Sequence, residues 1–319
     1  MSNKQRFDED EAVRSTNDDA STCKRFAVQL GYWADPYLPH LVRGTERKTP
    51  EINRGYFARV TAISILVRKF VNAMQGKCQV VSFGAGFDTL FWKLHSEGLT
   101  VQRFVELDFP NVTSRKCYYL KNSSKLLEAL QSDGKFTLST NELHSGTYHL
   151  AGADIRKLDE VESKLTECST DFKLPTLFLF ECVLVYMPVK QSKELLKFIT
   201  QKFSNAFCIN YEQANMKNRF GEVMLSNLRS RGCTLAGVEA CASLESQEDR
   251  FLQNGWEGAQ AMTMYHIYHS FLPPPEVHRI EKIEFLDEKE LLDQLLQHYC
   301  ICLAWKDSSN LNLHSLAFT

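Results

Sequence analysis

Alternation of short apolar runs with amphipathic segments, between residues 79 and 211, is the feature that most restricts the fold of this chain. The runs have the length and composition of β-strands and lie at residues 79–83, 104–108, 149–155, 176–180 and 206–211. Segments with helical spacing of apolar residues separate them. Because the run at residues 176–180 is continuously apolar, we expect its strand to be buried on both faces of the sheet. The pattern predicts an α/β fold with a mostly parallel sheet and helices on both faces.

The residues before this alternation are expected to form an addition to it. Residues 1–20 are acidic, with few apolar residues and no periodicity, so we expect a disordered N-terminus. Residues 52–74 have apolar side chains at helical spacing and predict a long helix. We therefore expect residues 21–75 to form an N-terminal arm and helix, within one domain that covers residues 21–319.

The pattern loosens after residue 212. Further helices and a last strand are expected at residues 216–231, 244–254, 276–299 and 301–305. The stretch 258–268 is ambiguous between helix and strand. This part of the chain predicts a helical insertion at residues 213–275, beyond what a minimal fold of this class needs.

Composition excludes several classes of function. The chain has 319 residues and a formal net charge of −2, so we expect no nucleic-acid partner. No apolar run reaches the ~18 residues that span a bilayer. The polar, acidic N-terminus is not a signal or transit peptide, so we expect no membrane association and a cytoplasmic location. The ten cysteines include no Cys-x-x-Cys pair and the nine histidines are scattered, which predicts reduced thiols and no metal site.

Ligands of open α/β sheets bind beyond the carboxyl ends of the strands, so the residues after each strand are the first site candidates. After the first strand comes Gly84-Ala85-Gly86, where glycine lets the backbone turn tightly and approach a ligand. Thr89 occupies the place of the third glycine of a dinucleotide fingerprint, which disfavours a pyrophosphate site. Asp108 ends the second strand, 22 residues after Gly86, a separation typical of a carboxylate that accepts hydrogen bonds from ribose hydroxyls. An ordinary glycine loop and a solvated carboxylate are the alternatives.

Two further strand ends carry carboxylates. Asp154 can accept a hydrogen bond from an exocyclic amine while the backbone N–H of Ile155 donates to a ring nitrogen, a pair that fits the edge of adenine. The alternative is that Asp154 caps a helix. Glu181 directly follows an apolar strand and is costly to bury unpaired. The α-amino group of a methionine moiety can compensate its charge, and an internal salt bridge is the alternative.

Basic residues of the arm and the long helix are candidates for binding a carboxylate. An arginine can do so through two parallel hydrogen bonds, although surface solvation is the default for any one of them. The candidates are Lys24, Arg25, Arg54 and Arg59. Together these groups match the needs of S-adenosylmethionine. Its binding requires a backbone that approaches it closely, an acceptor for the ribose hydroxyls and a pair of groups for the adenine edge. It also requires an anion for the amino group and a cation for the carboxylate.

Six motifs are distributed over nearly the whole chain, from about Cys23 to the C-terminal strand. They are Tyr32-Trp33-Ala34-Asp35-Pro36-Tyr37, Pro50-Glu51-Ile52-Asn53-Arg54-Gly55-Tyr56-Phe57-Ala58-Arg59, Gly84-Ala85-Gly86-Phe87-Asp88-Thr89, Glu181-Cys182-Val183-Leu184-Val185-Tyr186-Met187, Asn210-Tyr211-Glu212-Gln213 and Arg219-Phe220-Gly221. Together they make the sequence resemble the leucine carboxyl methyltransferases. The second motif is long and irregular and therefore specific, whereas Gly-x-Gly alone is not.

This resemblance implies a class I S-adenosylmethionine-dependent methyltransferase fold with an added helical lid. Such enzymes methylate the α-carboxylate of the C-terminal leucine of the protein phosphatase 2A catalytic subunit. Carried onto matching positions, the resemblance implies a set of cofactor-binding residues, which are Lys24, Arg59, Gly84, Asp108, Asp154, Ile155 and Glu181. Ile155 departs from the leucine that is common there, which matters little for a backbone contact.

A terminal carboxylate is ionised at neutral pH, so the expected reaction needs no general base. A basic or hydrogen-bonding group should orient that carboxylate, and the candidates are Arg59, Arg156 and Tyr186. We expect a monomeric enzyme that recognises the folded phosphatase. Three alternatives stay open: a carboxyl methyltransferase acting on a hypermodified transfer RNA guanosine, a non-catalytic phosphatase-binding protein, and a nucleotide-dependent oxidoreductase.

Overall fold

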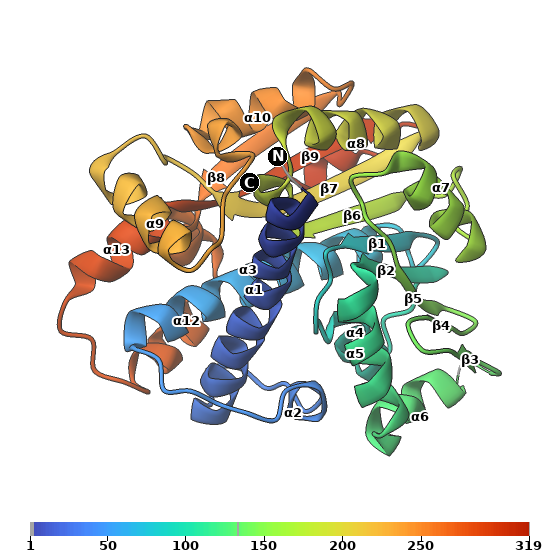
Figure 1. Ribbon diagram of the computed structural model, residues 1–319, viewed down its shortest axis with the longest axis horizontal. Coiled ribbons are helices and arrows are strands. Elements are labelled where there is room, and N and C mark those ends of the chain that lie inside the picture. The colour runs from blue at the N-terminus through green and yellow to red at the C-terminus, as the bar shows by residue number, and fades with distance from the viewer. Residues whose placement is uncertain (1–2, 133, 319) are drawn as a thin grey trace.

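The computed structural model describes residues 3–132 and 134–318, which form three layers around one sheet (Figure 1). The sheet has nine strands in the order β3-β4-β5-β2-β1-β6-β7-β9-β8. Their bounds are β1 Gln79–Phe83, β2 Arg103–Asp108, β3 Thr137–Leu138, β4 Leu143–His144, β5 Tyr148–Gly152, β6 Thr176–Glu181, β7 Asn205–Gln213, β8 Gly258–Thr263 and β9 Tyr299–Asp307. The five central strands, from β5 to β7, are parallel, so their carboxyl ends share one edge of the sheet.

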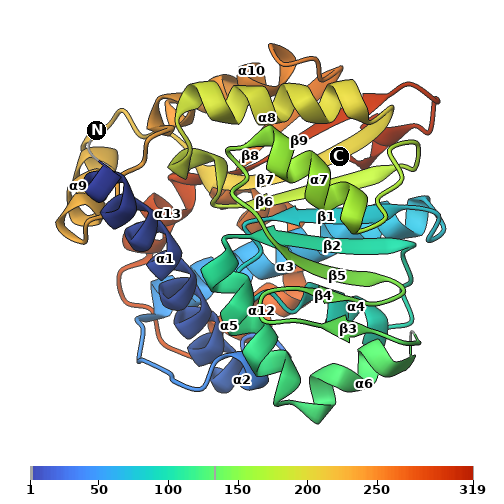
Figure 2. The ribbon, with the colours of Figure 1, turned by 45° about the vertical axis from the view of Figure 1, so that its right-hand side comes forward.

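Helices cover both faces of the sheet, as expected from the alternation. The α-helices are α1 Asn3–Leu30, α2 Leu38–Leu41, α3 Pro50–Ala73, α4 Leu90–Ser96, α5 Pro110–Lys121, α6 Ser124–Ser132, α7 Leu158–Glu167, α8 Val189–Lys202, α9 Arg219–Ser230, α10 Leu244–Leu252, α11 Met264–His266, α12 Pro274–Glu281 and α13 Lys289–Gln297. Short 3₁₀ and π turns are η1 Leu184–Tyr186, η2 Val238–Cys241, η3 Ile267–Phe271 and η4 Leu313–Leu316. Apolar side chains of α3, α4 and α5 pack on one face, and those of α7, α8 and α10 pack on the other (Figure 2).

The expectation of disorder over residues 1–20 is wrong for the described residues, because one helix, α1, runs from Asn3 to Leu30. Polar contacts hold its N-terminal half. Asp10 accepts two hydrogen bonds from Arg156 at 2.6 and 2.9 Å, and Asp18 accepts two from Arg115 at 2.7 and 2.9 Å. Such contacts leave no apolar periodicity in the sequence, which is why the pattern did not predict this part of the helix.

The expected helix at residues 276–299 is two helices, α12 and α13, separated by an irregular segment. Arg54, a buried residue of α3, donates hydrogen bonds to the backbone carbonyls of Glu281 and Glu284 at 3.2 and 3.0 Å. Asn53 and Tyr32 donate to the side chain of Glu284 at 2.8 and 2.9 Å. Since Arg54 satisfies carbonyls at and just after the end of α12, the helix ends there without proline or glycine.

The insertion at residues 213–275 is not wholly helical. Its ambiguous stretch contains β8, which forms an antiparallel edge with β9 from Gly258 to Thr263. The last strand, β9, is itself antiparallel to β7. The parallel sheet therefore continues into an antiparallel edge formed by β9 and β8. None of the described helices is long and apolar enough to cross a membrane.

Candidate active site

A cavity of about 540 Å³ opens at the carboxyl ends of the parallel strands, a volume ordinary for a small-molecule site. Its walls come from the ends of β1, β2 and β6, from the segment after β5, and from α1 and α3. Most of the residues expected from the sequence line it, namely Lys24, Arg59, Gly84, Asp108, Ile155, Arg156, Glu181 and Tyr186. Asp154, Arg25 and Arg54 are not among the described lining residues.

The glycines of the first loop are required by the protein's own packing. Gly84 and Gly86 have φ angles of +62° and +53°, in the left-handed region that favours glycine. A Cβ on Gly84 would lie 2.6 Å from a methyl carbon of Val183, and one on Gly86 would lie 2.3 Å from Oδ1 of Asn17. Asn17 belongs to α1 and also accepts a hydrogen bond from the N–H of Phe87 at 2.9 Å. The glycine loop is therefore covered by α1.

Gly86→Ala should destabilise the protein more than Gly98→Ala does. Both positions have positive φ, but Gly98 has open space where a Cβ would be added. Left-handed backbone costs an alanine about 1–2 kcal/mol at either site, and only the Gly86 variant must also displace Asn17. Urea unfolding measures the difference, and limited proteolysis reports release of α1. Equal losses in the two variants would show that Asn17 does not pack tightly on this loop.

Asp108 is buried at the end of β2 and faces the cavity from beneath the glycine loop. Its Oδ2 accepts a hydrogen bond from the N–H of Gly86 at 2.7 Å, and its Oδ1 accepts one from the N–H of Phe109 at 2.7 Å. Burial raises the pKa of the Asp108 carboxyl to about 6, although the two N–H groups and the charge of Lys116 lower it. The carboxylate is thus fixed in place and ionised at neutral pH.

If the cofactor is the S-adenosylmethionine expected from the sequence, this pKa predicts that affinity for its product, S-adenosylhomocysteine, falls as the pH drops through about 6. Above that pH the carboxylate accepts hydrogen bonds with both oxygens; below it one oxygen carries a proton and competes as a donor. Calorimetry between neutral and mildly acidic pH measures the change, with Asp108→Asn as the variant that should lack this step. A step of the same size in Asp108→Asn would assign it to another group.

Glu181 lies at the end of β6 between two cations. Its Oε1 accepts a hydrogen bond from Nζ of Lys24 at 2.8 Å and another from Nε of Arg59. Burial raises the pKa of Glu181, but the charges of Arg59 and Lys24 outweigh it and lower that pKa to about 2. The guanidinium of Arg59 also stacks 4.6 Å from the ring centroid of Tyr211. The sequence left open an internal salt bridge for Glu181, and the structure contains one, with partners that are themselves cofactor candidates.

Arg156 lines the cavity and contacts Asp154, which does not. The Arg156 side chain donates to Asp154 at 2.8 and 3.0 Å and reaches Asp10 of α1 with its two terminal nitrogens. Asp154 also accepts from the backbone N–H of Arg156 at 3.1 Å. It does not cap α7, which begins at Leu158 with Lys157 as its N-cap. Arg156 is therefore engaged by two carboxylates and joins the segment after β5 to α1.

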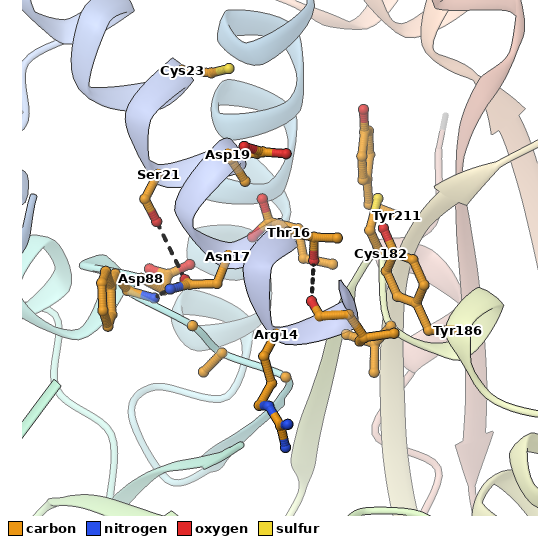
Figure 3. A pocket seen from close by; sticks show the side chains of 18 of the residues that line it. Arg14, Thr16, Asn17, Asp19, Ser21, Cys23, Asp88, Cys182, Tyr186 and Tyr211 are labelled. Carbon is orange, nitrogen blue, oxygen red and sulfur yellow. Dashed lines mark hydrogen bonds between the residues drawn. The ribbon is translucent and has the colours of Figure 1, made fainter. Parts of the chain in front are cut away.

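Sequence reasoning missed two parts of the wall. One is a group of tyrosines that lines the cavity with Tyr186, consisting of Tyr56, Tyr211 and Tyr299. Burial raises the pKa of each, that of Tyr299 to about 12, so all are neutral hydrogen-bonding groups at physiological pH. The other is α1, whose Asn17 and Ser21 lie on the side of Asp88 and whose Thr16 lies on the side of Tyr186 (Figure 3). Tertiary contacts bring both together, and no spacing in the sequence marks them.

Outside this cavity, one group of described residues has donor atoms close enough to share a metal ion. Each residue of this group contributes one donor atom, and these atoms lie within 4.8 Å of one another; the residues are His144, His149 and Cys168. The two imidazoles lie opposite each other in the β4–β5 pair, with their Nδ1 atoms 3.1 Å apart. The group lies at the edge of the sheet and does not line the cavity. All ten cysteines are free thiols.

Known proteins resemble this chain over nearly its full length. Residues 12–200 match the leucine carboxyl methyltransferase family. Leucine carboxyl methyltransferase 1 of Rattus norvegicus is 50% identical over 314 residues, covering 97% of this chain and 94% of that protein. The Caenorhabditis elegans protein of the same name is 44% identical over 306 residues, covering 93% and 92%. The human tRNA wybutosine-synthesizing protein 4 is 36% identical over 301 residues, which cover 92% of this chain but 44% of that protein.

The fold has a solved counterpart. A crystal structure of a methyltransferase from Thermobifida fusca superposes with a TM-score of 0.52 at 14% identity, covering 84% of this chain and 92% of that one. The sheet, the cavity at the carboxyl ends of its strands and the match to the family define an S-adenosylmethionine-dependent methyltransferase of class I. Within that class, the chain belongs to the leucine carboxyl methyltransferase family.

The donor set of the cavity fits this cofactor. S-adenosylmethionine carries an ammonium group, a carboxylate and a ribose with two hydroxyls, and the cavity presents a buried carboxylate, two cations and a fixed acceptor. Glu181, Lys24, Arg59 and Asp108 are those groups. In the arrangement observed, Glu181 offsets one of the two positive charges of Lys24 and Arg59, and the ammonium and carboxylate groups of a ligand can pair with these residues without adding net charge of their own.

Proposed function

We propose that this protein transfers a methyl group from S-adenosylmethionine to the α-carboxylate of the C-terminal leucine of the protein phosphatase 2A catalytic subunit, forming a methyl ester. The observation that carries the proposal is the buried group Lys24–Glu181–Arg59 beside Asp108 in one cavity. The resemblance across six motifs and the match to relatives called leucine carboxyl methyltransferase 1 support the choice of acceptor.

Each cofactor-binding residue has a separate task in this proposal. The cofactor supplies a methyl group on a sulfonium, and the protein residues hold it in place. Asp108 accepts hydrogen bonds from the ribose hydroxyls. Glu181 pairs with the ammonium group, while Lys24 and Arg59 turn towards the carboxylate. Backbone groups complete the site on the nucleoside side, contributed by Gly84 and Ile155, with Asp154 behind them.

The substrate carboxylate is already ionised, so the protein needs to orient it and remove its water. Tyr186 is neutral, lines the cavity and can donate a hydrogen bond. Arg59 contacts Glu181 and the ring of Tyr211, lines the cavity and can donate hydrogen bonds to a carboxylate. Arg156 is engaged by Asp10 and Asp154 and requires α1 to move before it can serve. We therefore propose that Tyr186 and Arg59, and not Arg156, orient the substrate carboxylate.

The test uses S-adenosylmethionine with a labelled methyl group and three acceptors: the phosphatase catalytic subunit, the same subunit without its last residue, and transfer RNA. We expect base-labile label on the complete subunit alone. The relative named tRNA wybutosine-synthesizing protein 4 makes transfer RNA the second candidate acceptor. Label on the RNA would favour that candidate, and no label on any acceptor would favour a non-catalytic phosphatase-binding protein.

Recognition of the folded phosphatase is expected to exceed recognition of its tail. The additions at residues 1–74 and 213–275 surround the cavity with helices that a minimal fold of this class lacks. We predict a much higher kcat/KM for the whole catalytic subunit than for a short peptide with the same C-terminus, measured in parallel reactions. Equal values for the two acceptors would contradict this prediction.

We further propose that the enzyme acts as a monomer in the cytoplasm. The net charge of −2 and the reduced thiols are compatible with that setting. Light scattering of the purified protein tests the first statement, and fractionation of cells with an antibody tests the second.

A further inference from the structure

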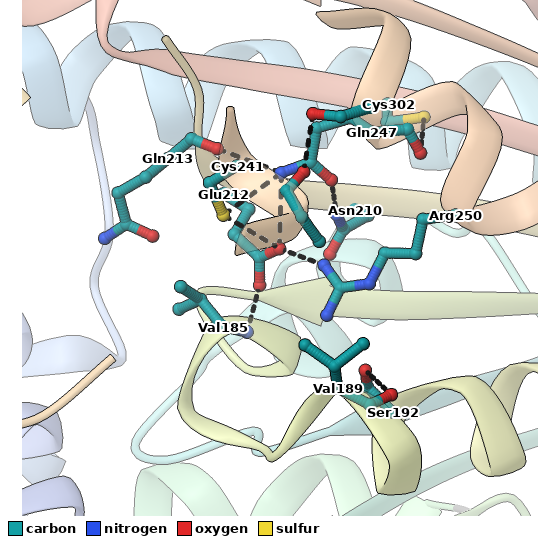
Figure 4. A network of polar contacts seen from close by, with 12 residues as sticks. Val185, Val189, Ser192, Asn210, Glu212, Gln213, Cys241, Gln247, Arg250 and Cys302 are labelled. Atoms are coloured by element: carbon teal, nitrogen blue, oxygen red, sulfur yellow. Dashed lines mark hydrogen bonds and ion pairs between the residues drawn. The ribbon is translucent and has the colours of Figure 1, made fainter. Parts of the chain in front are cut away.

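The motif Asn210-Tyr211-Glu212-Gln213 ends strand β7 and places a carboxylate behind the cavity wall. Glu212 pairs with Arg250 of α10 at 2.5 Å, and the two side chains are 0% and 2% exposed. Gln247 donates to the backbone carbonyl of Gln213 at 2.9 Å and approaches Glu212 at 3.4 Å. Figure 4 shows these side chains converging on the Glu212 carboxylate. We call Glu212, Gln247 and Arg250 the Glu212 network.

The second oxygen of Glu212 reaches the loop that follows β6. Its Oε1 accepts a hydrogen bond from the backbone N–H of Val185 at 2.5 Å (Figure 4). From the other side, the N–H of Gly237 donates to the carbonyl of Val185 at 2.8 Å. A Cβ on Gly237 would lie 2.8 Å from the carbonyl oxygens of Leu184 and Met187, so this approach is close. Both polar groups of Val185 are thus held by residues outside the loop.

This loop, residues 182–187, forms one wall of the cavity. Cys182, Val183, Tyr186 and Met187 line the cavity, whereas Glu212 is not among its described lining residues. Cys182 has a φ of +58°, a conformation that is sparsely populated for a residue with a Cβ. Such a loop keeps its shape only where its surroundings fix it. The N–H of Cys182 donates to the carbonyl of Tyr211, the residue before Glu212.

We infer that Glu212 is a positioning residue: through the N–H of Val185 it fixes loop 182–187, and with it Tyr186, for methyl transfer. Arg250 compensates the negative charge of the buried Glu212 carboxylate. The other two guanidinium nitrogens of Arg250 have no hydrogen-bond partner among the described residues, so this pair is the main polar contact of Arg250. The kinetic part of this inference rests on the proposed function. It also makes the inserted residues 237–250 a structural support of the catalytic loop.

Two double variants separate positioning from stability. Glu212→Leu/Arg250→Met removes both charges and the acceptor for Val185, while Glu212→Gln/Arg250→Met removes both charges but keeps an acceptor oxygen. Replacing both partners of a buried pair avoids the large penalty of leaving one charge alone. Ile209→Ala, on the same strand and facing the opposite apolar layer, serves as a control for lost packing.

For the leucine variant we expect kcat to fall on the order of tenfold, because small misplacement of a positioning group is costly. Its dissociation constant for S-adenosylhomocysteine should stay close to that of the wild type, because Glu181 keeps its own partners. The glutamine variant should regain most of the lost turnover. Hydrogen–deuterium exchange should be faster at residues 182–187 in the leucine variant, and unchanged there in Ile209→Ala.

The inference would be overturned if kcat of the leucine variant returned to the wild-type value whenever its melting temperature did. It would also be overturned if hydrogen–deuterium exchange at residues 182–187 of the leucine variant were as slow as in the wild type. The exchange measurement needs no methyl acceptor. If the wild-type protein leaves the phosphatase unmethylated, the proposed function fails, and exchange alone then decides the role of Glu212.

Discussion

Glu181→Ala should weaken S-adenosylmethionine binding by about 100-fold, the loss expected when one partner of a buried charge pair is removed. The variant leaves Lys24 and Arg59 in the cavity without the carboxylate that both of them contact. Calorimetry on the folded protein measures the loss. Glu97→Ala, which breaks the more exposed pair with Arg68, is the matched control and should bind the cofactor normally.

Stability separates the two roles left open for Glu181. Loss of the buried pair also destabilises the fold, so unfolding should be measured in the same buffers. If the folded fraction of Glu181→Ala binds the cofactor as tightly as the wild type, Glu181 is a structural partner of Arg59 and Lys24 only.

Asp108→Ala should lose affinity for S-adenosylhomocysteine by at least about 100-fold, because two hydrogen bonds to a charged acceptor disappear, each contributing about 1.5 kcal/mol or more. The N–H groups of Gly86 and Phe109 also lose their acceptor. A ribose-deoxygenated analogue of S-adenosylhomocysteine provides the control. It should bind the wild type weakly and lose much less in the variant.

The two losses are measured as a cycle, by calorimetry with both ligands on both proteins. A full penalty with the deoxygenated analogue would show that Asp108 acts through the shape of the glycine loop and not through the ribose.

The sequence predicted the site better than it predicted the chain around it. Asp108 and Glu181 were recognised because parallel strands bring their carboxyl ends to one edge, a consequence of topology that needs no long-range contact to be known. Gly84 and Gly86 were expected for ligand approach, whereas the structure explains them by Val183 and Asn17. The position of a glycine is visible in a sequence, but the atom that excludes its Cβ is not.

Polar long-range contacts account for what the sequence did not reveal. The N-terminal half of α1 is held by Arg156 and Arg115, residues more than 90 positions away, with an amphipathic signal too weak to predict it. The break between α12 and α13 depends on Arg54, which the sequence marked as a carboxylate binder. Glu212 belongs to a motif, residues 210–213, that the sequence marks only by its resemblance to a family. Its inferred role depends on Arg250 in the insertion, a contact that the sequence does not reveal.

The cavity itself links these observations. Helix α1 forms part of its wall, and loop 182–187, which the Glu212 network supports from the insertion, forms another part. Both additions to the minimal fold therefore act on the same small volume. This arrangement gives a physical reason for an enzyme of this family to retain long segments outside its sheet.

Mass spectrometry of the phosphatase catalytic subunit after reaction with the protein and S-adenosylmethionine tests the central claim most directly. The account predicts the added mass of one methyl group on the C-terminal peptide, located on its last residue and lost on mild base treatment. It predicts no addition when the subunit ends one residue earlier or when Glu181→Ala replaces the wild-type protein. A methyl group on any other residue, or an unmodified C-terminus in the presence of folded enzyme and cofactor, would contradict it.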